Sequence, residues 1–217
     1  WYFIVNHSAK NVDQWISFVM PFTNAVGYDP ISGRCDELAV QQKDNKAQVY
    51  LQIAAGSSII LGCDQRSQKI DSLQYVKSNG KPVTVKSTWQ LDFIEGKPEL
   101  PKSCTLKELK CWTQTPDSAA EAFAGTARYT LEFNLPKQAT DEWMLDLGDV
   151  RDSARVRING KDAGVAFALP FKMRVGSFLK SGSNTLEIEV TNLTANRIRA
   201  LEKSGINWKI LKNINIV

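Results

Sequence analysis

The stretch from 143 to 197 decides the fold: WMLDLGDVRDSARVRINGKDAGVAFALPFKMRVGSFLKSGSNTLEIEVTNLTANR. Within it Ala154, Val156 and Ile158 alternate with arginines, as expected for a strand with one buried face. Asn159-Gly160 follows at once, and this pair favours the positive φ angles of a tight hairpin. The pattern predicts antiparallel strands of a β-sandwich.

The same alternation recurs along the chain. After the turn residues 182–184, Leu186, Ile188 and Val190 are predicted to point inward, and the alternating Glu187 and Glu189 are predicted to point outward. Further strands are predicted at WYFIVN (1–6), WISFVM (15–20), AQVYLQI (47–53), SSIILG (57–62), WQLDF (89–93) and residues 128–133. Between 95 and 124 the alternation stops and three prolines exclude a long helix, although one or two helical turns at 105–110 stay open.

These segments predict an all-β protein of two antiparallel β-sandwich units. The first is expected over residues 1–85, with a polar linker that contains the turn cluster 77–82. The second is expected over residues 86–217. Its last run, Asn215–Val217, looks like a strand without a closing turn. We therefore expect the second unit to lack its final strand.

Composition narrows the class of protein. The 217 residues are 43% hydrophobic and 23% charged, with a net charge of +4, which is ordinary for a globular domain. The cations are dispersed among 23 acids, so we expect neither a nucleic-acid nor a membrane partner. No apolar run reaches the ~20 residues that cross a bilayer. The chain opens on tryptophan without a leader, so we expect it to be a piece of a longer polypeptide.

Cysteine and histidine content limits the chemistry. The four cysteines do not have the spacing of a metal knuckle. Cys104 and Cys111 could form a short-loop disulfide in an oxidising compartment, and buried thiols are the alternative. His7 is the only histidine and no GxSxG motif occurs, which argues against a hydrolytic triad.

The second unit resembles the galactose-binding-like jelly roll that glycoside hydrolase family 2 enzymes carry as their sugar-binding domain. The resemblance lies in the spacing NGxxxG from 159, PF at 170 and LKxGxNxLxIxVxN from 179. Further segments are similar to the C-terminal part of the α-L-rhamnosidases of glycoside hydrolase family 106: LKCWT (109–113), FAGTARY (123–129), LDLGDV (145–150) and NLTANR (192–197). The FIVNHS opening and the YDPISG turn extend this resemblance to the first unit.

The resemblance implies a non-catalytic region whose catalytic carboxylates and substrate-binding metal lie in a preceding barrel of the same polypeptide. Four positions depart from the family pattern. Cys111 stands where the pattern more often has serine, Phe167 where it has tryptophan, and Leu169 where it has proline. Thr194 stands near a position that is commonly aromatic. These departures weaken the expected aromatic platform for a sugar. The resemblance also implies a periplasmic or extracellular location in a bacterium.

Five residues are candidates for carbohydrate contact at the loop end of the second sandwich, because sugars bind aromatic faces and planar polar side chains. They are Trp112, Arg128, Phe167, Asn196 and Arg197. Each has a structural alternative: Trp112 as a core or interdomain anchor, Arg128 as an outward residue paired with an acid, and Asn196-Arg197 as a turn.

Two other function classes stay open. The chain could be a purely structural domain that packs against a catalytic barrel or mediates assembly, which six tryptophans would suit. It could also belong to a family 2 type β-glycosidase. Independent catalysis would need a carboxylate pair, and Asp146, Asp149 and Asp152 are the candidates. We expect no cofactor, although a structural calcium ion in a loop stays open.

Overall fold

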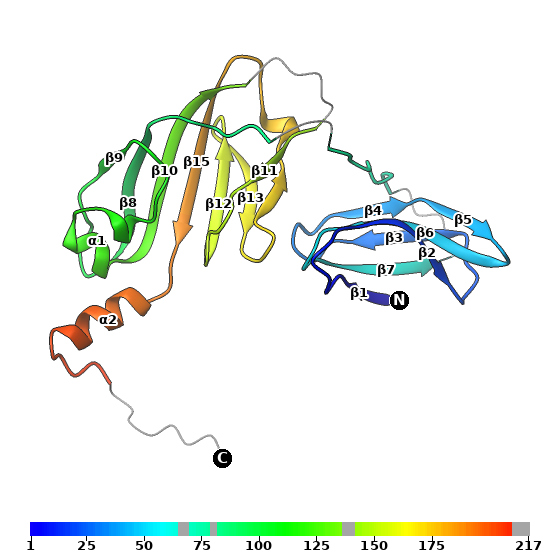
Figure 1. Cartoon of the computed structure of the whole chain (residues 1–217), viewed down its shortest axis with the longest axis horizontal. Coiled ribbons are helices and arrows are strands. Elements are labelled where there is room, and N and C mark those ends of the chain that lie inside the picture. Colours follow the sequence, from blue (N-terminus) through cyan, green and yellow to red (C-terminus); the bar gives the residue numbers. More distant parts are fainter. Residues whose placement is uncertain (65–69, 79–81, 136–141, 210–217) are drawn as a thin grey trace. The chain divides into compact units, whose positions relative to one another are not determined.

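The computed structural model describes residues 1–64, 70–78, 82–135 and 142–209. Antiparallel strands dominate these residues, and helices are short (Figure 1). The predicted all-β class is therefore confirmed. The expected final strand at Asn215–Val217 lies outside the described residues.

Contacts divide the chain into two compact units. The first contains residues 1–82, 140–148 and 166–174, and the second contains residues 83–139, 149–165 and 175–217. The boundary near Pro82 falls close to the end of the predicted linker, but two later segments group with the first unit. The division into domains at 1–85 and 86–217 stays a prediction.

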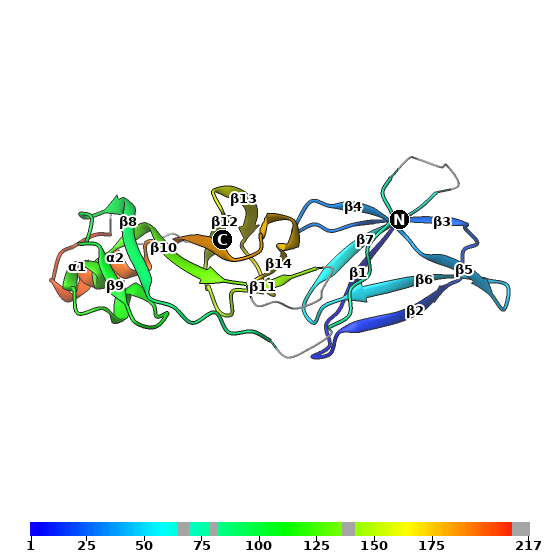
Figure 2. The same ribbon diagram turned by 90° about the horizontal axis from the view of Figure 1, so that it is seen from above.

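The first unit is a sandwich of two antiparallel sheets (Figure 2). The four-stranded sheet has the order β1-β7-β3-β4, and the three-stranded sheet has the order β2-β6-β5. Their bounds are β1 Tyr2–Val5, β2 Val12–Phe18, β3 Asn24–Tyr28, β4 Cys35–Leu38, β5 Val40–Lys43, β6 Lys46–Ile53 and β7 Ser58–Asp64. The same unit holds a two-stranded sheet of β11 (Met144–Asp146) and β14 (Lys172–Arg174).

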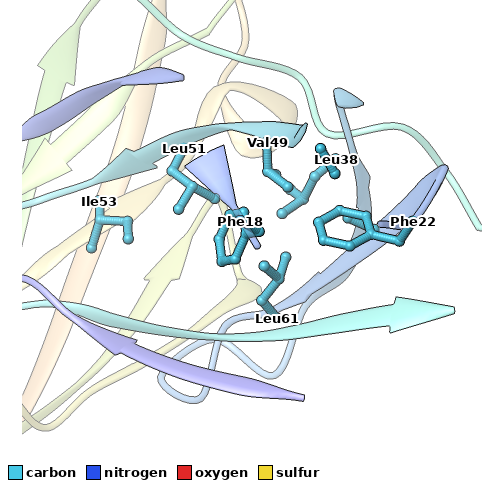
Figure 3. Packing of buried hydrophobic residues seen from close by; sticks show 9 residues of the cluster. Phe18, Phe22, Leu38, Val49, Leu51, Ile53 and Leu61 are labelled. Carbon is cyan, nitrogen blue, oxygen red and sulfur yellow. The ribbon is translucent and has the colours of Figure 1, made fainter. Parts of the chain in front are cut away.

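The first core forms between the two larger sheets because alternate side chains of both point inward. On β6, Val49, Leu51 and Ile53 are buried, as their alternation predicts. They meet Leu38 and Leu61 of the four-stranded sheet, together with two phenylalanines (Figure 3). This core is entirely apolar.

The second unit is built on a six-stranded sheet of order β13-β12-β15-β10-β8-β9. Its strands are β8 Trp89–Lys97, β9 Cys104–Leu106, β10 Ala124–Asn134, β12 Ser153–Ile158, β13 Lys161–Ala166 and β15 Ser183–Thr191. The 3-10 turns η1 (Trp112–Gln114) and η2 (Gly176–Phe178) and the helices α1 (Ser118–Ala122) and α2 (Ala195–Lys203) complete the described elements. The central strand β10 pairs with both β15 and β8.

One face of the six-stranded sheet is buried and the other is polar. Inward residues such as Val156 and Leu131 are almost completely enclosed. Over β8 and β10 the buried layer is aromatic: Phe123 and Trp112 pack edge to face, and both contact Phe93. The inward and outward assignments made for 154–158 and 186–190 agree with this burial.

Two local alternatives that the sequence left open are not found in the structure. The possible helical turns at 105–110 are instead the end of β9 and a bend, and the helix lies at α1, where Asp117 caps it by accepting a hydrogen bond from the Ala119 amide at 2.9 Å. The stretch after residue 194, interpreted as a turn, forms α2. Its apolar residues follow helical rather than strand spacing.

Candidate functional site

A polar hollow of about 350 Å³ lies between α1 and α2 in the second unit. We call it the helix hollow. Its lining residues are Thr113, Ser118, Glu121, Ala122, Asn196, Arg199, Ala200, Lys203 and Ser204. Hydroxyl, amide, carboxylate and guanidinium groups thus line one concavity, and such groups can form hydrogen bonds with a ligand rich in hydroxyl groups.

One ion pair closes an edge of the helix hollow. Lys203 Nζ donates to Glu121 Oε1 at 3.0 Å, and this hydrogen bond lowers the pKa of the Glu121 carboxyl. Arg199 has no ion-pair partner among the described residues, and its positive charge lowers the same pKa further. Arg199 and Asn196 are therefore the planar donors available to a ligand.

Of the five sequence-predicted residues, only Asn196 lines the helix hollow. Arg197, its neighbour on α2, is half-buried and points elsewhere in the first helical turn. The missed residues are Arg199, Lys203, Glu121 and Ser118. Helical spacing is the signal that could have found two of them, because Asn196, Arg199 and Lys203 recur at intervals of three and four residues.

Arg128 lies on the outward face of the six-stranded sheet, where acids surround it. Its Nη2 donates to Glu189 at 2.7 Å, and Arg157 reaches the same oxygen at 2.7 Å. Burial opposes ionisation of Glu189, yet the two arginines outweigh it and lower the pKa of the carboxyl. The hydrogen bond to Glu189 in turn raises the pKa of Arg128. Arg128 is thus an outward residue paired with an acid, which was the structural alternative to a carbohydrate contact.

A second hollow of about 360 Å³ lies on this outward face. Its lining residues are Ile94, Glu95, Thr126, Ser153, Arg155, Val165, Glu189 and Thr191. Arg155 is bound to Asp162, and Thr126 shares a hydrogen bond of 2.8 Å with Thr191. Arg155, Thr126 and Thr191 of this hollow thus have side-chain partners, as Lys203, Thr113 and Ser204 of the helix hollow have hydrogen-bond partners.

Trp112 is only 3% exposed and belongs to the aromatic core. Its ring stacks on Tyr129 with centroids 6.5 Å apart and planes inclined by 23°. Burial raises the pKa of Tyr129 far above its usual value. A ring enclosed in this way has no free face on which a sugar could stack. The Trp112 indole nitrogen has no hydrogen-bond partner among the described residues.

Phe167 is 53% exposed and belongs to the first compact unit, whereas the other four candidates belong to the second. The structure therefore describes no single site that contains all five residues. That any of them contacts carbohydrate stays a prediction.

The three acidic candidates for catalysis are held by cations or lie in turns. Burial alone would raise the pKa of Asp146, but the bonds from Lys172 at 2.9 Å and from the Gly148 amide lower it. Asp149 pairs with Arg151 at 2.8 Å. Every carboxyl whose pKa is shifted in the described chain is shifted downward, opposite to what a general acid needs.

The four cysteines are free thiols, so Cys104 and Cys111 are not joined in this structure. Among residues 1–64, 70–78, 82–135 and 142–209, no three His, Cys, Asp or Glu side chains gather closely enough to hold a metal ion. No helix in the described part of the chain is long and apolar enough to cross a membrane.

No protein-family model matches the chain. A putative beta-glucuronidase of Formosa agariphila is 34% identical over 137 residues, which are 62% of this chain and 12% of that protein. A beta-glucuronidase structure from Bifidobacterium dentium covers 54% of this chain and 21% of its own, with 23% identity and a TM-score of 0.43.

The structure of a rhamnosidase from Novosphingobium sp. PP1Y matches 97% of this chain and 20% of that one, with 24% identity and a TM-score of 0.75. The chain thus spans one fifth of that rhamnosidase and about an eighth of the curated relative. The predicted resemblance to rhamnosidases is confirmed at the level of the fold, because nearly the whole of this chain has the architecture of a segment of a rhamnosidase.

Proposed function

We propose that this chain is a non-catalytic accessory region of a glycoside hydrolase that acts on rhamnose-containing or related plant polysaccharides. One observation carries the proposal: 97% of the chain shares its fold with only 20% of a rhamnosidase. The matched segment is one fifth of that rhamnosidase, so four fifths of the rhamnosidase lie outside it. The sequence similarity to a putative beta-glucuronidase supports the same class of parent protein.

Within this role, the helix hollow is the proposed carbohydrate contact. Asn196 and Arg199 supply planar donors, and Ser118 and Thr113 supply hydroxyl groups, on a surface that α1 and α2 hold in place. Glu121 in this hollow is engaged by Lys203, which lowers the pKa of its carboxyl. Because a polysaccharide does not cross a membrane, the proposal includes a periplasmic or extracellular location.

Calorimetric titration of the chain with rhamnose, galactose, glucuronate and plant oligosaccharides tests the carbohydrate contact. We expect binding that falls at least about tenfold in Asn196→Ala and Arg199→Ala, which corresponds to roughly 1.4 kcal/mol. Arg151→Ala is the matched control, because Arg151 is an exposed arginine of the same unit outside the hollow. Binding that both hollow variants leave intact would contradict the site.

A purely structural or assembly role is the second candidate. The enclosed ring of Trp112 and the pairing of the Arg128 guanidinium with Glu189 favour it, since both residues have structural partners. No affinity for any saccharide, in a chain that folds normally, would decide for this role. A third candidate, a fragment of a family 2 type β-glycosidase, rests on the similarity to a putative beta-glucuronidase.

A further inference from the structure

In the four-stranded sheet of the first unit, the outward face over β1, β7 and β3 is apolar, and β4 at its edge adds Cys35 and the charged Glu37. Five side chains that point away from the core form it, and we call it the apolar face: Trp1, Phe3, Val26, Tyr28 and Ile60. Phe3 lies opposite Ile60 on the neighbouring strand, and Ile60 lies opposite Tyr28 on the next, so the side chains form a continuous row. Their strand neighbours, such as Ile4 and Leu61, point into the core.

Trp1 is held on this face by close packing. A Cβ atom at Gly62 would lie 2.9 Å from the Trp1 ring, so the indole packs directly over this glycine. The same ring contacts Tyr28, with centroids 5.4 Å apart. Trp1 nevertheless remains 80% exposed and Phe3 69% exposed. The face is therefore ordered by its own contacts and leaves large aromatic area in water.

The outward faces of the other two large sheets are polar. On the three-stranded sheet, Gln48 bonds to Ser17 and Gln41, and Tyr50 donates to Asp13 at 2.7 Å. On the six-stranded sheet the outward residues form the arginine and glutamate network around Arg128. An antiparallel sheet that faces water normally has one polar face. An apolar outer face is typical of a sheet that is covered on both sides.

We propose that another folded segment of the same polypeptide packs on the apolar face. This rests on the part of the proposed function that makes the chain a region of a larger enzyme, and not on carbohydrate binding. The similar rhamnosidase has four fifths of its length outside the matched segment, which is ample chain to cover a sheet. None of the five residues is charged, and buried interface centres are depleted of charge and enriched in aromatic residues.

The chemistry of the face argues against a sugar as its occupant. A bound sugar needs several polar side chains around the aromatic ring, and these five residues offer one indole N–H and one phenol. A second copy of this chain and the second unit of the same chain are the remaining occupants that the experiment must separate.

Hydroxyl-radical footprinting with mass spectrometry tests the proposal by comparing this chain with the polypeptide that the complete gene encodes. We expect oxidation of Trp1 and Phe3 to fall about tenfold in the complete polypeptide, because a packed interface excludes water. Trp15 and Val19, which are 38% and 89% exposed outside the apolar face, are the internal controls and should react equally in both.

Each other outcome overturns the proposal and identifies what replaces it. Protection already complete in this chain at low concentration points to its own second unit, and protection that rises with concentration points to a second copy. Protection that appears only with added oligosaccharide points to a sugar. Equal oxidation in both proteins, or a gene that encodes no further folded segment, contradicts any intramolecular partner.

A substitution provides a second measurement. Phe3→Lys should leave the melting temperature of this chain unchanged, since the side chain is exposed here, and should lower that of the complete polypeptide. Val19→Lys is the matched control and should change neither protein. A Phe3→Lys variant of the complete polypeptide with an unchanged melting temperature would contradict the proposal. Calorimetric titration of Asn196→Ala and Arg199→Ala with saccharides tests carbohydrate binding separately. Its outcome therefore does not depend on whether a segment packs on the apolar face.

Discussion

Asn159 Nδ2 donates a 2.9 Å hydrogen bond to Asn184 Oδ1, and this bond joins the β12-β13 hairpin to the start of β15. Asn184 is 1% exposed and also binds Lys180 and Gly182 through their main chains. Asn159 in turn accepts a bond from the Thr185 amide. The two asparagines of the NGxxxG and LKxGxNxL segments thus have a structural role that accounts for their spacing.

Replacing Asn184 with alanine should lower the free energy of unfolding by about 2–4 kcal/mol, because several buried main-chain groups lose their partner. Urea unfolding of the two proteins measures this difference. Asn134→Ala is the control, since Asn134 is exposed at the end of β10 and should cost less than about 0.5 kcal/mol. Equal effects of the two substitutions would contradict the structural role of Asn184.

Replacing Gly160 with valine should cost about 1–3 kcal/mol, because a β-branched residue resists a positive φ angle. Gly160 has φ +75° and Asn159 has φ +53°, as the sequence predicts for this hairpin. No atom lies within 4 Å of a Cβ built at Gly160, so the cost is conformational. Gly160→Asn should cost less, since asparagine tolerates this region.

Thermal unfolding of both Gly160 variants gives this comparison. Affinity for any saccharide, measured on the folded fraction, should stay unchanged in both. Loss of binding without loss of stability would place the ligand at the hairpin and not at the helix hollow.

Replacing Glu189 with glutamine should lower stability by about 1–2 kcal/mol at pH 7, because Arg128 and Arg157 lose a shared charged partner. The pKa of Glu189 is lower in the folded state, so its contribution is present above the unfolded pKa of about 4.3. That contribution disappears as the pH falls through the folded pKa. The difference between wild type and Glu189→Gln should therefore shrink as the pH falls below about 4.3, the unfolded pKa.

Urea unfolding at several pH values measures this loss. Glu187→Gln is the matched control on the same strand, because Glu187 Oε1 lies 3.8 Å from Arg128 Nε, beyond hydrogen-bond distance, and its replacement should cost less. A difference for Glu189→Gln that does not vary with pH would show that packing, and not charge, is lost.

The chain by itself should not hydrolyse aryl rhamnosides or galactosides, because Asp146 and Asp149 are engaged with Lys172 and Arg151. Release of the chromophore over time, with repurified protein, measures any activity. Turnover that persists on repurification and disappears in Asp146→Asn or Asp149→Asn would contradict a non-catalytic role.

The local pattern of apolar and polar residues determined strands such as β6 and β12 and which way their side chains point, although β3 and β9 were not predicted. Val156 is apolar and Arg157 is charged, and they face opposite sides of β12 because successive side chains of a strand point to opposite faces. The Asn159-Gly160 hairpin likewise follows from two residues that tolerate positive φ. These features need no information from distant parts of the chain.

Tertiary structure alone decided what each face meets. Arg128 was expected to point outward, but its partner Glu189 lies 61 residues away and is chosen by the pairing of β10 with β15. Trp112 stands in an irregular stretch without periodicity, so its burial depends on the aromatic rings that β8 and β10 bring to it. The helix hollow exists because α1 and α2, over 70 residues apart, pack together. Such contacts depend on long-range packing, which a local residue pattern does not encode.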